Sequence, residues 1–372
     1  MKSIAKRIPK PPLKPRSPLI VPPPPQQQPV QETVIATIPF SLRDIYTLSP
    51  RVLMQIQKRA VEEAQFYNPN RRDFRYPDSQ ILFEIRNNKI QKLITHIPKD
   101  QFQSRLHITQ DFMQRVVNQQ NYKIHGNFII NLHDKSDLHP NVNEIVFTKH
   151  QNTQKAVIPD IYAMESYKRV GDIPDPIPFH QKKGKGIFIG VTTGDLNPMI
   201  NERLQLCNYS HFLKQTGKES FFDFYINHLA QIPEEKIAQA YPHYKQFIKG
   251  DLSIQDQRQY KYVINVDGNT TSWDRLVWVY QGNNILVKKR SENVGWYYPL
   301  MEKGKHFVEF ENGPDLNLKI EVMNRMWERN PSRIEELMKT QREFLQNYLC
   351  PLAHLTYTCM LFHEMSKKYK EI

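Results

Sequence analysis

Two short apolar runs, each followed at once by a glycine-containing polar turn and then by a helical stretch, constrain the fold of this chain most strongly. The first run is 187–189 with the turn Gly190–Gly194, and the second is 262–266 with a turn that starts at Asp267. A strand, a turn and a helix in this order are typical of α/β proteins with parallel strands. In open sheets of that kind, ligands bind beyond the carboxyl ends of the strands. We therefore expect the two turns to converge on one ligand.

Further apolar runs place strands and helices on both sides of a segment, 167–186, that concentrates proline, glycine and charge. That composition indicates a domain boundary. We therefore predict an N-terminal α/β domain over 36–180 and a C-terminal α/β domain over 181–372. The other strands are predicted at 80–84, 89–93, 128–132, 145–147, 156–158, 285–288 and 307–310, and the helices at 50–67, 201–214, from Asn330 onward and beyond Pro351.

The first 35 residues differ from the rest of the chain. They hold ten of the 27 prolines, and the residues before Glu32 supply six of the net +13 charges. Such a composition favours a disordered, extended tail. It could serve as a Pro-rich docking arm or be a solvated extension with no dedicated partner; the second interpretation is favoured, and we assign the tail no role. The remaining +7 is a mild bias toward anionic partners and does not predict a nucleic-acid partner.

Composition also bears on the compartment. The sequence shows no run of eighteen apolar residues and no signal peptide, so we expect no transmembrane segment and a cytoplasmic protein. The three cysteines are too few and too scattered for a disulfide framework, which fits a reducing compartment.

The first turn has the composition of a phosphate cradle. Its glycines let backbone N–H groups approach an anion, Thr192 and Thr193 add hydroxyl donors, and the helix that follows contains Arg203. The turn ends on Gly194 and is neither a Walker loop nor a dinucleotide fingerprint. Turns of this kind are also common for purely structural reasons.

The second turn offers donors, an aromatic ring and a cation. Gly268, Asn269 and Ser272 lie at its tip, and Trp273 and Arg275 are expected just inside the next helix. An arginine can bridge a diphosphate and a tryptophan can stack on a ring. The alternative is a tryptophan in the core and an arginine in a salt bridge, and spacing alone leaves both interpretations open.

At this turn the chain resembles glycosyltransferase family 90. The resemblance rests on N-V-D-G-N-T-T-S-W-D-R-L at Asn265–Leu276, followed by G-x-x-I-L-V-K, W-Y-Y-P-L, H-F-V and D-L in the family's order and spacing. Upstream, F-I-G-V-T-T-G at Phe188–Gly194 resembles the family's donor loop. N-L-H-D at Asn131–Asp134 resembles the strand that ends in its catalytic aspartate. The similarity covers about 125–365.

This resemblance implies a GT-B fold, in which two Rossmann-like α/β domains face each other across a cleft, here with helices at the C-terminal end. It implies an inverting transfer of glucose or xylose from a UDP-sugar to a hydroxyl of a glycan or protein. It further implies a transfer without a bound metal or another cofactor. The sequence agrees with this, since it contains no Asp-x-Asp pair, the carboxylate spacing with which many metal-dependent glycosyltransferases hold a cation. The resemblance implies the following site residues: Asp134 as the base, and Thr192, Thr193, Gly194, Gly268, Asn269, Ser272, Trp273 and Arg275 around the donor.

Alternatives remain for the base and for the activity. His133 or Asp137 would be the base if the alignment were shifted, and an aspartate at this place could instead cap a loop. The family's donor loop has an arginine before its glycine, where this chain has Ile189. The loss of that cation keeps open a catalytically inactive relative that acts as an interaction protein.

Cys350, His354, Cys359 and His363 have the composition of a zinc site but not its geometry. On a continuous helix each residue advances about 100°, so the first two face away from the last two. We therefore expect these side chains in core positions of a final helix.

Overall fold

The structure is a computed structural model that describes residues 47–72, 74–76, 78–98, 102–134, 141–168, 170 and 174–370. The described residues belong to one unit of the chain, which begins at Thr37. The predicted tail, 1–35, and the alternative base Asp137 lie outside the described residues. The predicted docking through the tail therefore gains no support.

The first of two five-stranded sheets is mixed, with the order β2-β1-β3-β4-β6. β1 runs antiparallel to both β2 and β3, whereas β3, β4 and β6 are parallel. Asn87 and Asn88 join β1 to β2 with positive φ at both positions, the geometry of a two-residue hairpin turn. The predicted parallel, Rossmann-like sheet is thus wrong for this half. Its strands are β1 (Gln80–Arg86), β2 (Lys89–Ile94), β3 (Gly126–Asn131), β4 (Ile145–Val146) and β6 (Ala156–Val157).

The second sheet is entirely parallel, with the order β8-β7-β9-β10-β12. Numbered along the chain this is 2-1-3-4-5, the order of a doubly wound α/β sheet, in which connections leave β7 and β9 in opposite directions. The crevice between those two strands is the place where such sheets bind ligands. Its strands are β7 (Lys183–Gly190), β8 (Phe222–Ile226), β9 (Tyr260–Asn265), β10 (Ile285–Lys289) and β12 (Val308–Phe310).

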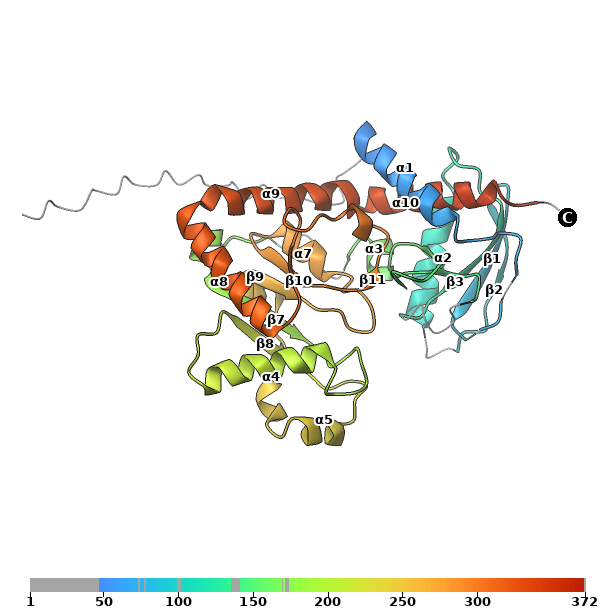
Figure 1. Cartoon of the computed structure of the whole chain (residues 1–372). Coiled ribbons are helices and arrows are strands. Elements are labelled where there is room, and N and C mark those ends of the chain that lie inside the picture. The colour runs from blue at the N-terminus through green and yellow to red at the C-terminus, as the bar shows by residue number, and fades with distance from the viewer. Residues whose placement is uncertain are drawn as a thin grey trace, which may run out of the picture. The chain divides into compact units, whose positions relative to one another are not determined.

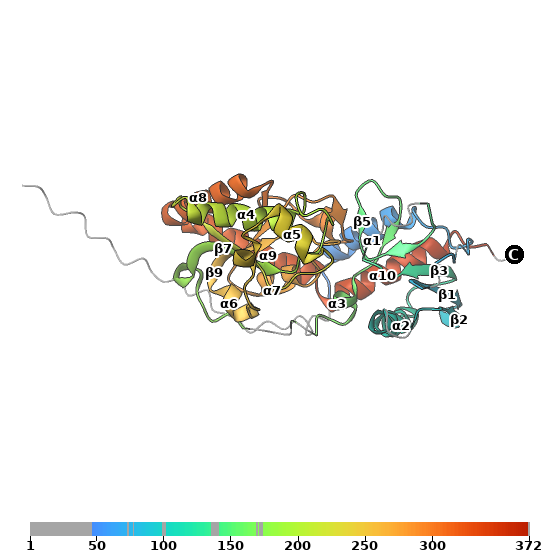
Figure 2. The same cartoon turned by 90° about the horizontal axis from the view of Figure 1, so that it is seen from below.

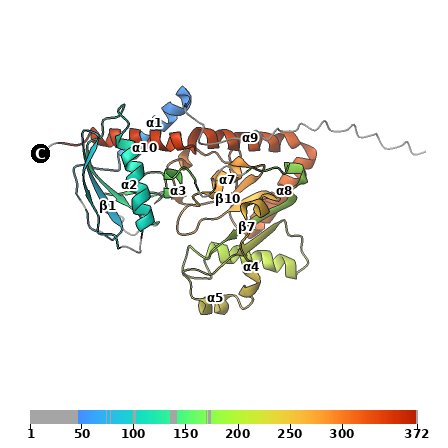
Figure 3. The same ribbon diagram turned by 180° about the vertical axis from the view of Figure 1, so that it is seen from behind.

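Helices cover both faces of the second sheet (Figure 1; Figure 3 shows the reverse side). Successive strand residues alternate between two cores: Ile187 packs in the core that contains α7, and Phe188 packs in the core that contains α4 and α8. Strands buried on both faces read as continuous apolar runs, which is why the sequence revealed them. The helices concerned are α4 (Glu202–Gln215), α7 (Arg275–Gln281), α8 (Gly313–Arg329) and α9 (Pro331–Tyr348).

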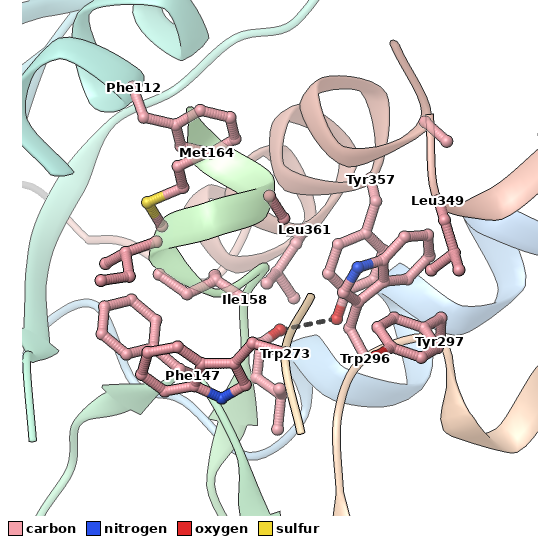
Figure 4. Close-up of a cluster of buried hydrophobic side chains, with 14 of the residues drawn as sticks. Phe112, Phe147, Ile158, Met164, Trp273, Trp296, Tyr297, Leu349, Tyr357 and Leu361 are labelled. Carbon is pink, nitrogen blue, oxygen red and sulfur yellow. Dashed lines mark hydrogen bonds between the residues drawn. The ribbon is translucent and has the colours of Figure 1, made fainter. Parts of the chain in front are cut away.

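The final helix returns to the elements of the first sheet. α10 (Pro351–Ser366) packs against α1 (Pro50–Ala64), α2 (Gln103–Val117) and α3 (Ile161–Met164) (Figures 1 and 2). Its Tyr357 stacks on Trp296 with ring centroids 4.3 Å apart, within a core that also holds Phe147 and Trp273 (Figure 4). The predicted helices near 50, 201 and 331 and beyond Pro351 are all present.

Within the part of the chain that the structure describes, none of the helices combines the length and the apolar character needed to cross a bilayer.

Candidate functional site

The two glycine turns lie against each other at the carboxyl ends of β7 and β9. The backbone N–H of Gly194 donates to Asn269 Oδ1 at 3.3 Å. A Cβ atom placed on Gly268 would stand 2.4 Å from Thr193 Oγ1, closer than any real contact allows. Gly194 itself has a φ of +122°, a conformation that residues other than glycine rarely adopt. The two turns are therefore adjacent, as convergence on one ligand requires, and their close approach depends on glycine in both.

Arg203, on the first turn of α4, holds the two turns together. At the first glycine turn its guanidinium donates to the carbonyl of Val191 at 2.7 Å and to Thr193 Oγ1 at 2.8 Å. At the second glycine turn it donates to the carbonyls of Val266 at 3.0 Å and Asp267 at 3.1 Å. Burial lowers the pKa of Arg203 to about 10, so the side chain stays cationic at neutral pH. Its charge is thus fixed beneath the junction of the turns.

A cavity of about 460 Å³ opens over this junction. Its size falls within the range of small-molecule sites. Its walls come from the segments that follow β7, β9, β10 and β12, together with His150 from β5 (Lys149–His150). Of the predicted donor residues, Thr193, Gly194 and Gly268 line it. Lining residues that the sequence did not reveal include His150, Asp195, Lys289, Arg290, Ser291 and Asn293.

Carboxylates accompany the other basic groups of the cavity. Lys289 Nζ lies 2.6 Å from Glu202 Oε1, and Arg290 lies 3.1 Å from a carboxylate oxygen of Glu311. His150 Nε2 lies 2.5 Å from a carboxylate oxygen of Glu292. The exposed rim is therefore a set of ion pairs, each of modest strength in water. The guanidinium of Arg203 is held mainly by backbone carbonyls instead.

Three predicted donor residues have other surroundings. Thr192 is fully buried, and its hydroxyl donates to the carbonyl of Ala230 and accepts from the Ala230 N–H, both at 2.7 Å. Asn269 is partly buried and accepts from Gly194. Ser272 is partly exposed, at the end of the second turn. Thr192 therefore stabilises the first glycine turn by joining it to the backbone of Ala230.

Arg275 lies under the turns rather than among the cavity-lining residues. It donates to the carbonyl of Ile264 at 3.1 Å and to that of Ile189 at 2.7 Å, so it bridges β9 and β7. Its guanidinium lies 4.5 Å from the ring centroid of Phe188, over which Arg203 also lies, at 5.3 Å. Burial lowers the pKa of Arg275 to about 10. Two cations therefore share one aromatic ring below the cavity, and Ile189 contributes only its backbone there.

Trp273 precedes α7 instead of starting it, because the helix begins at Arg275 with Asp274 as its N-cap. Only 9% of the side chain is exposed. Its ring meets that of Phe147 edge to face at a centroid distance of 6.1 Å (Figure 4). It meets the ring of Tyr162 in the same way at 5.4 Å. Of the two interpretations of Trp273, the one that places it in the core therefore agrees with its packing.

Asp134 follows β3, at the carboxyl end of that strand. A quarter of its side chain is exposed, and Oδ1 lies 2.6 Å from Nη1 of Arg105 on α2. Its neighbour His133 packs against the ring of Phe102. A partly exposed carboxylate at a strand end can accept a proton from a bound hydroxyl.

Three members of the Cys/His set at the end of the chain lie in the core, whereas His363, contrary to the prediction, is partly exposed, with Nδ1 3.0 Å from the carbonyl oxygen of Lys123. Cys350, His354 and Cys359 are buried, as predicted. Trp296 donates its indole N–H to His354 Nδ1 at 3.1 Å, and the Tyr167 hydroxyl lies 2.8 Å from Nε2. Burial lowers the pKa of His354 to about 3, so the ring is neutral. Among the described residues, no group of three or more His, Cys, Asp or Glu side chains has the arrangement of a metal site.

Comparison with known proteins gives one informative similarity. No known protein family matches the sequence. The chain is 22% identical to the O-glucosyltransferase LpsA of Dichelobacter nodosus over 220 residues, which are 59% of this chain and 58% of that protein. The chain thus matches somewhat over half the length of this relative.

A solved structure, a glycosyltransferase from Rickettsia africae ESF-5, aligns over 53% of this chain and 50% of that one, with 12% identity and a TM-score of 0.32. A likeness at that level carries no argument about the fold.

Proposed function

We propose that this protein is an inverting glycosyltransferase that resembles family 90 and has a GT-B arrangement. In this proposal it moves a sugar from a UDP-sugar to a hydroxyl of a glycan or protein. The observation that carries the proposal is the meeting of two glycine turns around Arg203 at the crevice of a doubly wound sheet. Nucleotides bind in crevices of this kind. The sequence similarity to an O-glucosyltransferase makes glucose the first sugar to test, ahead of xylose.

The donor would bind in the cavity over the turns. The diphosphate would lie near Gly194 and Gly268, where the absence of side chains lets it approach the backbone closely. Arg203, Thr193 and Lys289 would supply charge and hydrogen-bond donors to it. Arg275 would act from below, through the field of its charge and by fixing β7 to β9. In this proposal the departing diphosphate is stabilised by these side chains, without a metal.

Asp134 would act as the general base. The acceptor hydroxyl gives its proton to the carboxylate while its oxygen forms a bond to the anomeric carbon. The bond from that carbon to the diphosphate breaks on the opposite face, and the electron pair leaves on the phosphate oxygen. The configuration at the anomeric carbon is therefore inverted. The domain of 36–180 would present the acceptor and that of 181–372 would bind the donor.

One observation favours a second candidate, an inactive relative that serves as an interaction protein. The rim cations of the cavity are paired with carboxylates, and the position before Gly190 carries no cation. A cavity in this state could bind anions weakly. The two candidates differ in turnover, because only the enzyme cleaves the bond between sugar and diphosphate.

The test is a panel of UDP-sugars incubated with the wild type and with Asp134→Asn. The wild type should hydrolyse or transfer at least one sugar, with UDP-glucose first. Asp134→Asn should lose at least about 100-fold in turnover, as expected for a lost general base, while UDP binding by calorimetry stays unchanged. Turnover by the variant equal to that of the wild type would remove Asp134 from the mechanism. UDP binding without turnover of any sugar would favour the interaction protein.

A further inference from the structure

The surroundings of Asp134 contain an arginine whose position helix stability does not explain. Arg105 is the third residue of α2, and the first turn of that helix has no acidic residue. A cation at this end of a helix opposes the helix dipole. The placement of Arg105 therefore needs another cause, and its contacts supply one.

The guanidinium of Arg105 holds two consecutive parts of the segment after β3. Nη1 donates to the carbonyl of Leu132 at 2.7 Å and lies 2.6 Å from Asp134 Oδ1. Oδ1 is buried, so the exposed quarter of the Asp134 side chain falls on its remaining atoms. Arg105 thereby fixes both the backbone before the carboxylate and the direction of the carboxylate itself. An acceptor hydroxyl could meet the carboxyl group on the exposed part of this side chain.

The residue whose ring packs against the Arg105 guanidinium, Phe102, has a strained backbone conformation. Phe102, the N-cap of α2, has φ +56°, and its side chain forms no capping hydrogen bond. A phenylalanine in this left-handed conformation is unfavourable, and such strain persists only where surrounding contacts impose it. The Phe102 ring lies beneath the Arg105 guanidinium at 5.2 Å and packs against His133 at 5.6 Å. The strained conformation of Phe102 thus places its ring in contact with Arg105 and with His133, the residue next to Asp134.

A further contact of Arg105 reaches the second glycine turn. The Arg105 guanidinium also lies 5.2 Å from the ring centroid of Trp273. Trp273 ends the turn that begins at Asp267 and contains Gly268. A cation over a tryptophan face is the strongest form of this interaction. Arg105 is therefore in contact with both the carboxylate and the turn proposed to hold the donor.

We propose that Arg105 is a positioning residue, which orients Asp134 and couples it to the donor turn through Trp273. This inference rests on the proposed transferase function. It makes three statements about kinetics. Loss of Arg105 should lower kcat more than it raises the donor KM; lysine, which keeps the charge but loses the planar fork, should restore part of the rate; and the effect should require Asp134.

The experiment is a double-mutant cycle with Arg105→Gln and Asp134→Asn, with Arg105→Lys as the conservative variant. Arg105→Gln should lower kcat by at least about 10-fold, within the range that a misdirected base costs, with the donor KM changed less than about twofold. In the Asp134→Asn background, Arg105→Gln should have no further effect, since residues that act as one unit are not additive. The matched control is Arg115→Gln on the same helix, whose guanidinium also lies over a phenylalanine and donates to a carbonyl, that of Met164. It should keep wild-type kcat.

The outcomes separate the two proposals. Turnover by Arg105→Gln equal to that of the wild type, or equal losses from Arg105→Gln with and without Asp134, overturns the role of Arg105 and leaves the enzyme standing. A wild type that binds UDP but turns over no sugar removes the proposed function and the positioning role with it. If Arg105→Gln unfolds, Phe102→Gly serves as the second variant, because it relieves the left-handed strain while removing the ring beneath the guanidinium. It should lower kcat in a protein that remains folded at the assay temperature, and wild-type kcat there would also contradict the proposal.

Discussion

The carboxyl ends of parallel strands in the two sheets carry opposite kinds of ionisable group. Beyond β3 and β6 of the first sheet stand the carboxylates of Asp134 and Asp160, the latter as the N-cap of α3. Beyond β7 and β9 of the second sheet stand the guanidinium groups of Arg203 and Arg275. Burial raises the pKa of Asp160 to about 7 and lowers that of each arginine to about 10. The same local pattern, a strand followed by a polar loop, thus places carboxyl groups at one edge and guanidinium groups at the other.

The largest effect is expected on the acidic side, from Asp160→Asn. The pKa of Asp160 is about 7 in the folded protein against 3.8 for an ordinary aspartate. Between about pH 4 and 7 the unfolded chain is therefore ionised where the folded one is protonated, so folded wild type loses stability as the pH rises, by at most about 4 kcal/mol. Above about pH 7 no further loss follows. Asparagine can still accept the capping bonds from Tyr162 and Ala163, so the variant should not show this decline.

Urea unfolding of both proteins at about pH 5 and about pH 8 measures the difference. The variant should gain on the wild type as the pH rises. Parallel pH profiles of stability in the two proteins would contradict the raised pKa of Asp160.

On the basic side, Arg203→Met should destabilise the fold by about 3 kcal/mol. The substitution leaves the carbonyls of Val191, Val266 and Asp267 without their donor, and unpaired buried acceptors cost about 1–3 kcal/mol. Urea unfolding should show the loss, and UDP binding should weaken with it. The matched control is Arg325→Gln on α8, an exposed arginine paired with Glu321, which should change stability by less than about 0.5 kcal/mol. Equally small changes in the free energy of unfolding for Arg203→Met and Arg325→Gln would contradict the role of Arg203 in joining the turns.

A smaller and opposite effect is expected from Glu202→Gln. Glu202 holds Lys289 at the rim of the cavity, and its removal frees that ammonium group for a phosphate. The affinity for UDP should rise about two- to fivefold, in line with about 0.5–1 kcal/mol for an exposed ion pair. Glu321→Gln, on α8 and outside the cavity lining, is the control and should leave the affinity unchanged. Weaker binding by Glu202→Gln would mean that the rim does not receive an anion.

The sequence predicted the second sheet better than the first, for a physical reason. Strands buried on both faces form continuous apolar runs, and the glycine turns that follow β7 and β9 mark their carboxyl ends directly. In the first sheet, β1 and β2 were found as strands, but an apolar run does not reveal strand direction. The Asn87-Asn88 turn is the local signal for the antiparallel hairpin, because asparagine readily adopts the positive φ that such a turn requires.

The candidate site was predictable only where its residues follow a strand. Asp134, Thr193 and Gly268 do so, and each was named from the sequence. Lys289 and His150 reach the cavity from β10 and β5 through tertiary packing that no spacing encodes. Arg105 lies on α2, 29 positions before Asp134, and a cation in the first turn of a helix gave no sign of its partner. Arg275 was named from the same turn as Gly268, but its side chain runs beneath the turn to backbone carbonyls.

The central claim is that the two glycine turns form one site for a nucleoside diphosphate. Calorimetric titration of UDP into the wild type, Gly268→Ala and Gly250→Ala tests it most directly. Gly268 has no room for a Cβ beside Thr193 and Arg203, whereas nothing lies within 4 Å of a Cβ at Gly250. We predict that Gly268→Ala loses at least about 10-fold in UDP affinity, about 1.4 kcal/mol, while Gly250→Ala binds as the wild type does. Wild-type UDP affinity in Gly268→Ala would contradict the claim.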